Sequence, residues 1–311
     1  MLDAEILDKI SLPRLDKYKE AFGLTAYEHA YAVYVWNKML AGAFTPLVQS
    51  VEVSLRNAIN QGIMTDPKYG WLWFTNVYRT KDLPGSFAKL HHHIVNKFTH
   101  HDLDILKENG DASYTTILKS TYDKKIKKGA PSAKRSYNQH IIGNLMLGSW
   151  VVLLNSDYVD NTHKTKLWPN LTSTIFPNAV GAEKDNLFHI YNNVRLFRNR
   201  ISHNEPLCRA ATGAATQQIN ASIEFMSEKY QELLHALGLI SRIRQQQIND
   251  GPATSHFYSV CSKEYVNRLI DSFTTGRLRV CGKCKKTYTT STGSTCPCRI
   301  KMIPGDVRTR P

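Results

Sequence analysis

Apolar residues recur at helical spacing along most of the first 248 residues. The pattern predicts helices over about residues 14–18, 26–39, 46–63, 140–154, 183–202 and 217–237. In the third of these, Thr45 before Pro46 predicts a helix start, because the first turn does not need the N–H that proline lacks. Gly238 is a plausible end for the last helix. These signals favour an all-α domain.

Two of the predicted helices have a clear inward stripe. From Pro46 to Ile63 the stripe consists of Leu47, Val51, Leu55, Ala58 and Ile59. The helix over residues 183–202 has its own stripe, made of Leu187, Ile190, Val194 and either Phe197 or Ile201. Polar side chains beside these stripes are candidates for chemistry, and on the first of the two helices they are Glu52, Arg56 and Asn57.

The clearest linker in the sequence is the polar, glycine- and proline-containing stretch from Asn249 to Ser255. We therefore expect a helical domain over residues 1–248, a linker with a short helix over 249–276, and a small basic module over 277–311. No run of apolar residues approaches the length of a membrane span, and the N-terminus lacks the features of a signal peptide. We expect a cytoplasmic protein with no membrane partner and with reduced cysteines.

The chain is strongly basic, with 40 Lys and Arg residues against 26 Asp and Glu and a net charge of +14. Such a charge attracts polyanions, which makes nucleic acid the leading partner class. The charge is concentrated between Lys119 and Arg135 and again after Arg277. The expected RNA-binding residues are Lys124, Lys125, Lys127, Lys128, Lys134 and Arg135, together with Arg195.

A cluster of polar groups ends the predicted helix over residues 183–202. The segment from Arg198 to Pro206 reads Arg-Asn-Arg-Ile-Ser-His-Asn-Glu-Pro. RNA can be cleaved without a metal when its own 2′-hydroxyl attacks the adjacent phosphate, which requires a base and a fixed cation. His203 suits the first role and Arg198 the second. Asn199 is placed to orient His203 or a phosphate oxygen.

Positions five apart diverge by about 140° on a straight helix, so Arg198 and His203 do not face one another on one. Either the helix ends near Ser202 and His203 folds back, or the arginine of one subunit meets the histidine of another. A purely structural interpretation is also open. In it, the cationic and imidazole groups stabilise the carbonyl end of the helix.

The segment from Arg198 to Pro206 resembles the Arg-polar-x-x-x-His signature of HEPN domains, in the version found in Abi-like proteins of bacterial phage defence. Other stretches are similar to the same family. These are Leu15-Asp16-Lys17-Tyr18, Glu52 to Ile59, Leu147 to Val151, Leu167 to Leu171 and Phe176-Pro177. The chain departs from the family at Asn204, where members often have a second histidine.

The resemblance implies an all-α, HEPN-type helical bundle with a helical N-terminal extension, and a homodimer whose two signatures line a shared cleft. It also implies metal-independent RNA cleavage that is toxic to the infected host. By position, Arg198 and His203 take the catalytic roles and Asn199 a supporting one, with Glu52, Arg56 and Asn57 near the cleft. An inhibitory partner RNA or an antitoxin is a possible silencing partner.

Four of the six cysteines lie close together near the C-terminus, at Cys281, Cys284, Cys296 and Cys298. Cys-x-x-Cys followed by Cys-x-Cys outlines a tetrahedral four-sulfur site, which predicts a structural zinc ribbon. Uncoordinated thiols and disulfides are the alternatives. Cys208 and Cys261 lie apart from this group and are interpreted as ordinary small residues.

Three functions remain open on the sequence. The first is a metal-independent endoribonuclease in which zinc is structural and catalysis needs no cofactor. The second is a non-catalytic RNA-binding or adaptor protein that uses its basic surfaces and its zinc ribbon. The third, a zinc-ribbon DNA-binding regulator, is the least favoured because no known recognition-helix pattern is present.

Overall fold

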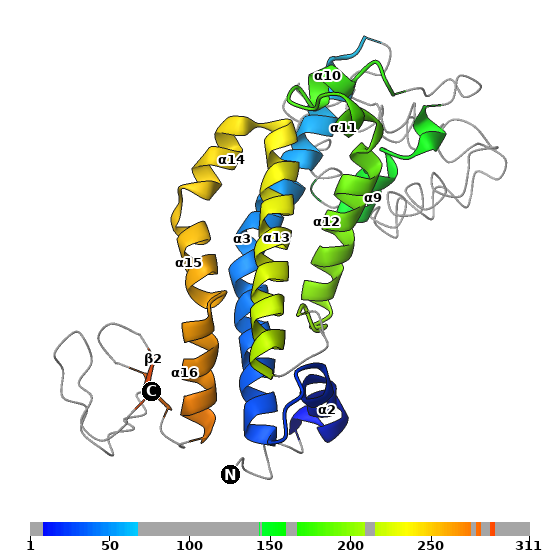
Figure 1. Ribbon diagram of the computed structural model, residues 1–311. Coiled ribbons are helices and arrows are strands. Elements are labelled where there is room, and N and C mark those ends of the chain that lie inside the picture. Colours follow the sequence, from blue (N-terminus) through cyan, green and yellow to red (C-terminus); the bar gives the residue numbers. More distant parts are fainter. Residues whose placement is uncertain are drawn as a thin grey trace, which may run out of the picture. The chain divides into compact units, whose positions relative to one another are not determined.

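Helices make up nearly all of the secondary structure in the computed structural model (Figure 1). The structure describes residues 9–67, 143, 145–159, 167–208, 215–274, 278–280 and 287–289. These residues belong to two compact units, one formed by residues 1–46, 200–231 and 250–311 and the other by 47–199 and 232–249. The described part of the chain thus confirms the all-α prediction for the main body.

The longest element, α3, runs without interruption from Tyr27 to Thr65 and contains Pro46. The predicted helix start at Pro46 is therefore wrong. Proline has no N–H, so the carbonyl of Gly42, four residues earlier, loses its usual helical hydrogen bond. Gly42 and Pro46 are both exposed, so water can hydrate that carbonyl. Phe44 and Leu47 on either side of the proline are completely buried. Packing on both sides keeps the helix continuous where local signals favour a break.

The first unit packs α15 (Pro252–Val260) and α16 (Lys263–Thr274) alongside the N-terminal part of α3 (Figure 1). The short helix α2 (Leu12–Ala21) precedes α3 in the same unit. The Trp36 indole N–H donates to the carbonyl of Val260 at 2.9 Å. The rings of Tyr230 and Phe257 stack with their centroids 4.0 Å apart, and Phe44 meets Phe257 edge-on at 4.8 Å. Buried aromatic contacts therefore stabilise this unit.

The second unit packs the stripe of α3 inward, since Leu47, Val51, Leu55 and Ile59 are all fully buried. Its other helices are α9 (Leu147–Val152), α10 (Thr172–Ile175), α11 (Ala182–Asp185), α14 (Arg242–Asn249) and the 3₁₀ helix η1 (Ser156–Tyr158). Parts of two long helices also belong to this unit. They are the residues of α12 (Leu187–Ser202) up to 199 and the residues of α13 (Ala215–Ile240) from 232 onward. Within this unit the Tyr191 hydroxyl of α12 donates to the Ala236 carbonyl of α13 at 2.8 Å.

Several predicted boundaries differ from the observed ones. The predicted helix over residues 183–202 is two helices, α11 and α12, separated at Asn186. The stretch before α9 is not helical at Leu145 and Met146, where the backbone of Met146 is extended. Gly238 does not end α13, which continues to Ile240, and its carbonyl accepts a hydrogen bond from the Asn178 side chain at 2.9 Å.

Residues 249–276, predicted as a linker with a short helix, consist largely of the two helices α15 and α16. Pro252 of the predicted linker instead opens α15. Beyond them, strands β1 (Leu278–Val280) and β2 (Thr287–Thr289) pair antiparallel, with Val280 opposite Thr287. None of the described helices combines the length and apolar composition that a membrane span requires.

Gly62 of α3 tests the packing of the second unit, and Gly42 of the same helix is the control. A Cβ at Gly62 would overlap the buried side chain of Ile175, whereas a Cβ at Gly42 would meet open space. Gly62→Ala should lower the free energy of unfolding by about 1–3 kcal/mol because the core is already filled. Gly42→Ala should raise it by about 0.5–1 kcal/mol, the usual helix-propensity gain. Urea denaturation of both variants measures this, and a stabilised Gly62→Ala would contradict the described packing.

Candidate functional site

The helix that carries the signature, α12, ends at Ser202 in a Schellman motif. The N–H of Asn204 donates to the carbonyl of Ile201 at 3.2 Å, and the N–H of Glu205 to the carbonyl of Arg200 at 2.9 Å. Asn204 has a φ of 54°, the left-handed conformation that this motif requires at the position after the cap. The helix therefore ends where the sequence predicts, and the chain reverses at Asn204.

The Schellman motif gives the departure from the family pattern a physical reason. Asparagine adopts the left-handed conformation more readily than other residues except glycine, so Asn204 suits the turn. His203 lies immediately before the turn, at the cap position, and is exposed. An exposed imidazole at a helix terminus is accessible to a substrate from solvent.

Three side chains anchor the chain just after the turn. Arg200 donates to the carbonyl of Pro206, and its Nε lies 3.8 Å from a carboxylate oxygen of Glu205. Asn37 of α3, 4% exposed, donates from Nδ2 to the carbonyl of Glu205 at 3.2 Å. Its Oδ1 accepts from the N–H of Leu207 at 2.7 Å. Both ends of one buried amide thus hold the backbone that follows His203.

Sequence reasoning missed Asn37 and the anchoring role of Arg200. A signal for Asn37 was available, because the residue falls on the same helical face as Val33, Leu40 and Phe44, all of which are completely buried. A polar side chain on such a stripe must find hydrogen-bond partners inside the protein. The sequence alone does not reveal that those partners are residues 205 and 207.

The second unit contains a charge cluster formed by Glu52, Arg56 and Arg198. One carboxylate oxygen of Glu52 lies 3.7 Å from Nη2 of Arg56, one turn along α3, and the other lies 3.8 Å from Nε of Arg198 on α12. The Glu52 side chain is 17% exposed and that of Arg198 36%. Two guanidinium groups therefore share one carboxylate at a partly exposed position.

Polar atoms without a partner lie buried in the same unit. Nε of Arg56 and the hydroxyl of Ser149 are both buried and have no hydrogen-bond partner among the residues that the structure describes. Leaving such groups unpaired in the protein interior is unfavourable. The Arg56 guanidinium thus keeps unused hydrogen-bonding capacity next to Glu52.

Arg195, one turn before the signature on α12, is held in a defined orientation. Its Nε and Nη2 both donate to Oδ1 of Asn192, at 3.0 and 2.8 Å. A Cβ at Gly148 would lie 3.5 Å from Cδ of Arg195, an ordinary van der Waals distance, so the arginine stem lies close to the backbone at this position. Gly148 belongs to one of the stretches that resemble the family.

The remaining predicted residues divide into two groups. Asn57 is exposed and Asn199 is half-buried. Neither side chain makes a polar contact with another residue of the described part. The other candidates lie outside the described residues. They are the RNA-binding candidates Lys124, Lys125, Lys127, Lys128, Lys134 and Arg135, and the zinc candidates Cys281, Cys284, Cys296 and Cys298.

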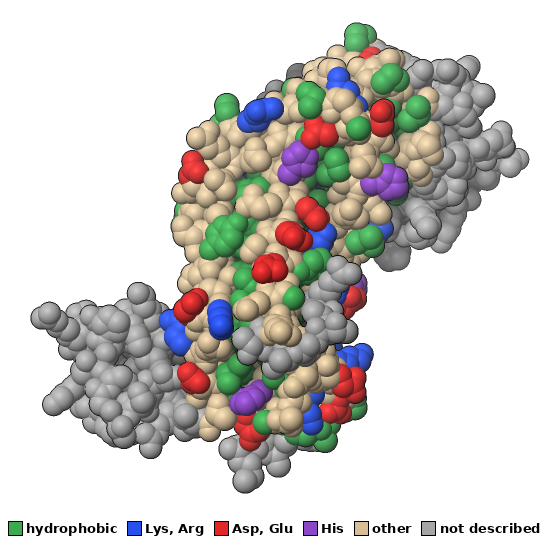
Figure 2. Space-filling model, in the orientation of Figure 1, with side chains coloured by type: hydrophobic (Ala, Val, Ile, Leu, Met, Phe, Trp, Pro, Cys, Tyr) green, Lys and Arg blue, Asp and Glu red, His purple; other side chains and the backbone are tan. Residues whose placement is uncertain are grey.

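Charge is balanced over the described residues. They hold 16 of the 40 Lys and Arg residues and 15 of the 26 Asp and Glu residues, so the net charge of +14 belongs almost entirely to the rest of the chain. On the face shown in Figure 2, basic and acidic side chains are interspersed across the described surface. The described surface therefore carries little net charge, and the two arginines of the cluster lie on a nearly neutral background.

Cys208 and Cys261 are buried free thiols. Burial raises the pKa of Cys261 to about 11 and raises the pKa of Cys208 further. Both thiols remain protonated at neutral pH and are poor nucleophiles. This agrees with their interpretation as ordinary small residues.

Replacing Asn37 tests whether its amide stabilises the segment after the signature. Asn37→Ala should lower the free energy of unfolding by about 1–3 kcal/mol, because it leaves the Leu207 N–H and the Glu205 carbonyl without their partner. Asn193, an exposed asparagine of α12, is the control, and Asn193→Ala should change stability by less than about 0.5 kcal/mol. Equal effects in urea denaturation would contradict the anchoring role.

Comparison with known proteins agrees with the resemblance of the signature. The profile of the Abi-like protein family matches residues 5–209, about two thirds of the chain. No match was found among curated proteins or among solved structures. The matched range contains both Glu52 with its arginine partners and the whole segment from Arg198 to Pro206. The chain belongs to the Abi-like protein family.

Proposed function

We propose that this protein is a metal-independent endoribonuclease that acts in bacterial abortive infection. Membership of the Abi-like family supports the role in phage defence. The single observation that supports cleavage most is the cluster in which Glu52 shares its carboxylate between Arg56 and Arg198.

The charge cluster suits a phosphate. Glu52 helps to fix the position of the Arg198 guanidinium, and the Arg198 side chain is 36% exposed. Arginine remains charged at any relevant pH and offers parallel N–H groups that match phosphate oxygens. A phosphate diester would bind to the exposed part of the Arg198 guanidinium. Electrostatic stabilisation of this kind is the main requirement for a pentacoordinate phosphate transition state.

The proposed reaction uses the substrate's own nucleophile. His203 accepts the proton of the ribose 2′-hydroxyl, and the 2′-oxygen forms a bond to the adjacent phosphorus. Arg198 stabilises the negative charge that develops on the phosphate oxygens. The bond from phosphorus to the 5′-oxygen then breaks, and that oxygen takes up a proton. The products have a 2′,3′-cyclic phosphate and a 5′-hydroxyl.

The two groups can come from one chain or from two. In the first case the arginine and the histidine of one signature act on the same phosphate. In the second case, a homodimer brings Arg198 of one subunit to His203 of the other. The two signatures then line one shared cleft, which contains two such Arg–His pairs. The second arrangement requires a dimer for activity, which the first does not.

Single substitutions test the proposed roles. With EDTA present throughout, Arg198→Ala and His203→Ala should each lower the rate of RNA cleavage by at least about 100-fold, because each removes a group that acts in the transition state. The controls are Arg242→Ala and His256→Ala, which remove exposed residues of the same types from α14 and α15. Circular dichroism checks that all four variants fold.

Full activity of either signature variant would contradict the proposal. RNA binding that survives in both variants, with no cleavage by the wild type, would instead favour a non-catalytic RNA-binding protein. Mixing the two inactive variants tests the dimer. Recovery of about a quarter of the activity is expected if each site combines two subunits, since half of the dimers are then mixed and each has one intact site. No recovery indicates sites within single chains.

We also propose that the C-terminal module binds a structural zinc ion through Cys281, Cys284, Cys296 and Cys298. Strands β1 and β2 flank the first cysteine pair in the sequence, with β1 ending at Val280 and β2 beginning at Thr287. A hairpin around a Cys-x-x-Cys pair is a common arrangement in zinc ribbons. Thiolate ligands of this kind would hold the metal in a closed site without open positions for catalysis.

Metal content tests this module. The purified chain should contain one zinc ion, and the double variant Cys281→Ser/Cys284→Ser should contain none, because two thiolates cannot close a four-ligand site. The variant Cys208→Ser/Cys261→Ser is the matched control and should keep its zinc. Elemental analysis measures the zinc content of the wild type and of both variants. If the wild-type protein contains no zinc after growth in zinc-supplemented medium, the proposal is contradicted.

A further inference from the structure

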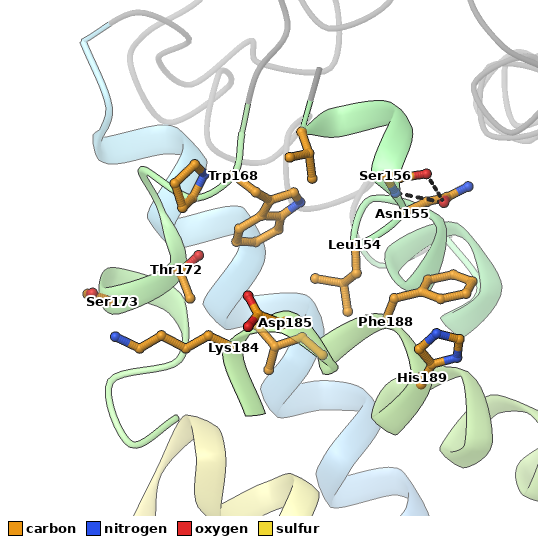
Figure 3. Close-up of a pocket in the computed structure, with 13 residues that line it drawn as sticks. Leu154, Asn155, Ser156, Trp168, Thr172, Ser173, Lys184, Asp185, Phe188 and His189 are labelled. Atoms are coloured by element: carbon orange, nitrogen blue, oxygen red, sulfur yellow. Dashed lines mark hydrogen bonds between the residues drawn. The ribbon is translucent and has the colours of Figure 1, made fainter. Parts of the chain in front are cut away.

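A pocket of about 830 Å³ lies in the second unit, apart from the charge cluster described above. Its lining comes from η1, α10, α11 and the beginning of α12, together with the turns before them (Figure 3). This volume lies within the range of pockets that bind small organic molecules. Nothing in the proposed cleavage reaction uses it.

Aromatic rings form part of the pocket lining. Trp168 is 6% exposed, and its indole N–H donates to the carbonyl of Leu153 at 2.7 Å, so the ring is fixed in orientation. On another wall the rings of Phe188 and His189 meet edge-on with their centroids 5.5 Å apart. Aromatic rings in the lining favour a planar ring as the ligand.

Two charged side chains of opposite sign, Lys184 and Asp185, line the pocket. Figure 3 shows the Asp185 carboxylate pointing toward the indole of Trp168. Lys184, the preceding residue, extends along the same wall toward Ser173. Neither Lys184 nor Asp185 has an ion-pair partner among the described residues. A suitable ligand has a planar ring with hydrogen-bond donors, which would meet the Asp185 carboxylate. It also has a negative group, which would meet Lys184.

One face of α12 connects the pocket with the signature. Phe188, Asn192, Arg195 and Asn199 are spaced by three or four residues, so they share a face of the helix. All four are half-buried, and Arg195 is oriented by its bonds to Asn192. The face extends about 16 Å from Phe188 to Asn199 at the rise of an α-helix. An extended RNA strand can follow it over a few nucleotides.

We propose that this pocket binds one unpaired guanine of the RNA strand, a few nucleotides from the cleaved phosphate. The proposal rests on the proposed ribonuclease function and adds a substrate preference to it. Unpaired bases are recognised by stacking on aromatic rings and by hydrogen bonds to their edges. Guanine presents two parallel N–H donors, at N1 and the 2-amino group, which match the two oxygens of the Asp185 carboxylate. Lys184 is placed to meet a phosphate of the same nucleotide.

Cleavage of a randomised single-stranded RNA pool tests the preference. Sequencing of the wild-type products should show guanine enriched about tenfold at one fixed position near the cut, the selectivity expected for a bidentate pair. Asp185→Asn should remove most of the enrichment, because the amide offers one acceptor where the carboxylate offers two. Glu228→Gln removes the same charge from an exposed position of α13 and should keep it. Cleavage without a positional preference, or a preference unchanged in Asp185→Asn, overturns the proposal.

Calorimetric titration of the full chain with 5′-GMP separates this proposal from the proposed function. Binding of GMP but not UMP, lost in Asp185→Asn and kept in Glu228→Gln, supports the guanine site even if the protein does not cleave RNA. GMP binding together with unselective cleavage overturns the placement of the RNA strand and identifies a site for free guanine nucleotides. If no RNA is cleaved and GMP does not bind, both proposals are wrong.

Discussion

The candidate site depends on one electrostatic constraint, the sharing of the Glu52 carboxylate between two arginines. A carboxylate that is 17% exposed requires a positive partner, and Arg198 and Arg56 each lie within 3.8 Å of one of its oxygens. The carboxylate helps to fix the position of Arg198, whose side chain is 36% exposed. That oriented and accessible guanidinium is the physical basis for proposing that a phosphate binds there.

Backbone geometry imposes a second constraint on the signature. The Schellman motif requires a left-handed residue at position 204, and asparagine supplies it. Beyond the turn, the Asn37 amide and the Arg200 side chain hold residues 205–207. His203 therefore lies between a regular helix and an anchored segment, which restricts its backbone although its side chain is exposed. A fixed backbone with an accessible side chain is suited to a general base.

Local patterns predicted the helical class and the buried stripe of Leu47, Val51, Leu55 and Ile59, because burial follows helical periodicity. They did not predict the continuity of α3 through Pro46, which depends on packing on both sides of the proline. The partners of Asn37 lie 168 and 170 residues away, and Glu52 and Arg198 are also far apart in the sequence. Periodicity contains no information about such contacts. Resemblance to the family pointed to the residues, and the structure supplied the geometry that relates Glu52 to Arg198.

The most direct test of the central claim is the chemistry of the RNA ends. Full-length protein is incubated with single-stranded RNA in EDTA, and the products are identified by mass spectrometry. Attack by the 2′-hydroxyl predicts a 2′,3′-cyclic phosphate on one fragment and a 5′-hydroxyl on the other. Fragments with a 3′-hydroxyl and a 5′-phosphate, or RNA that stays intact, would contradict the account.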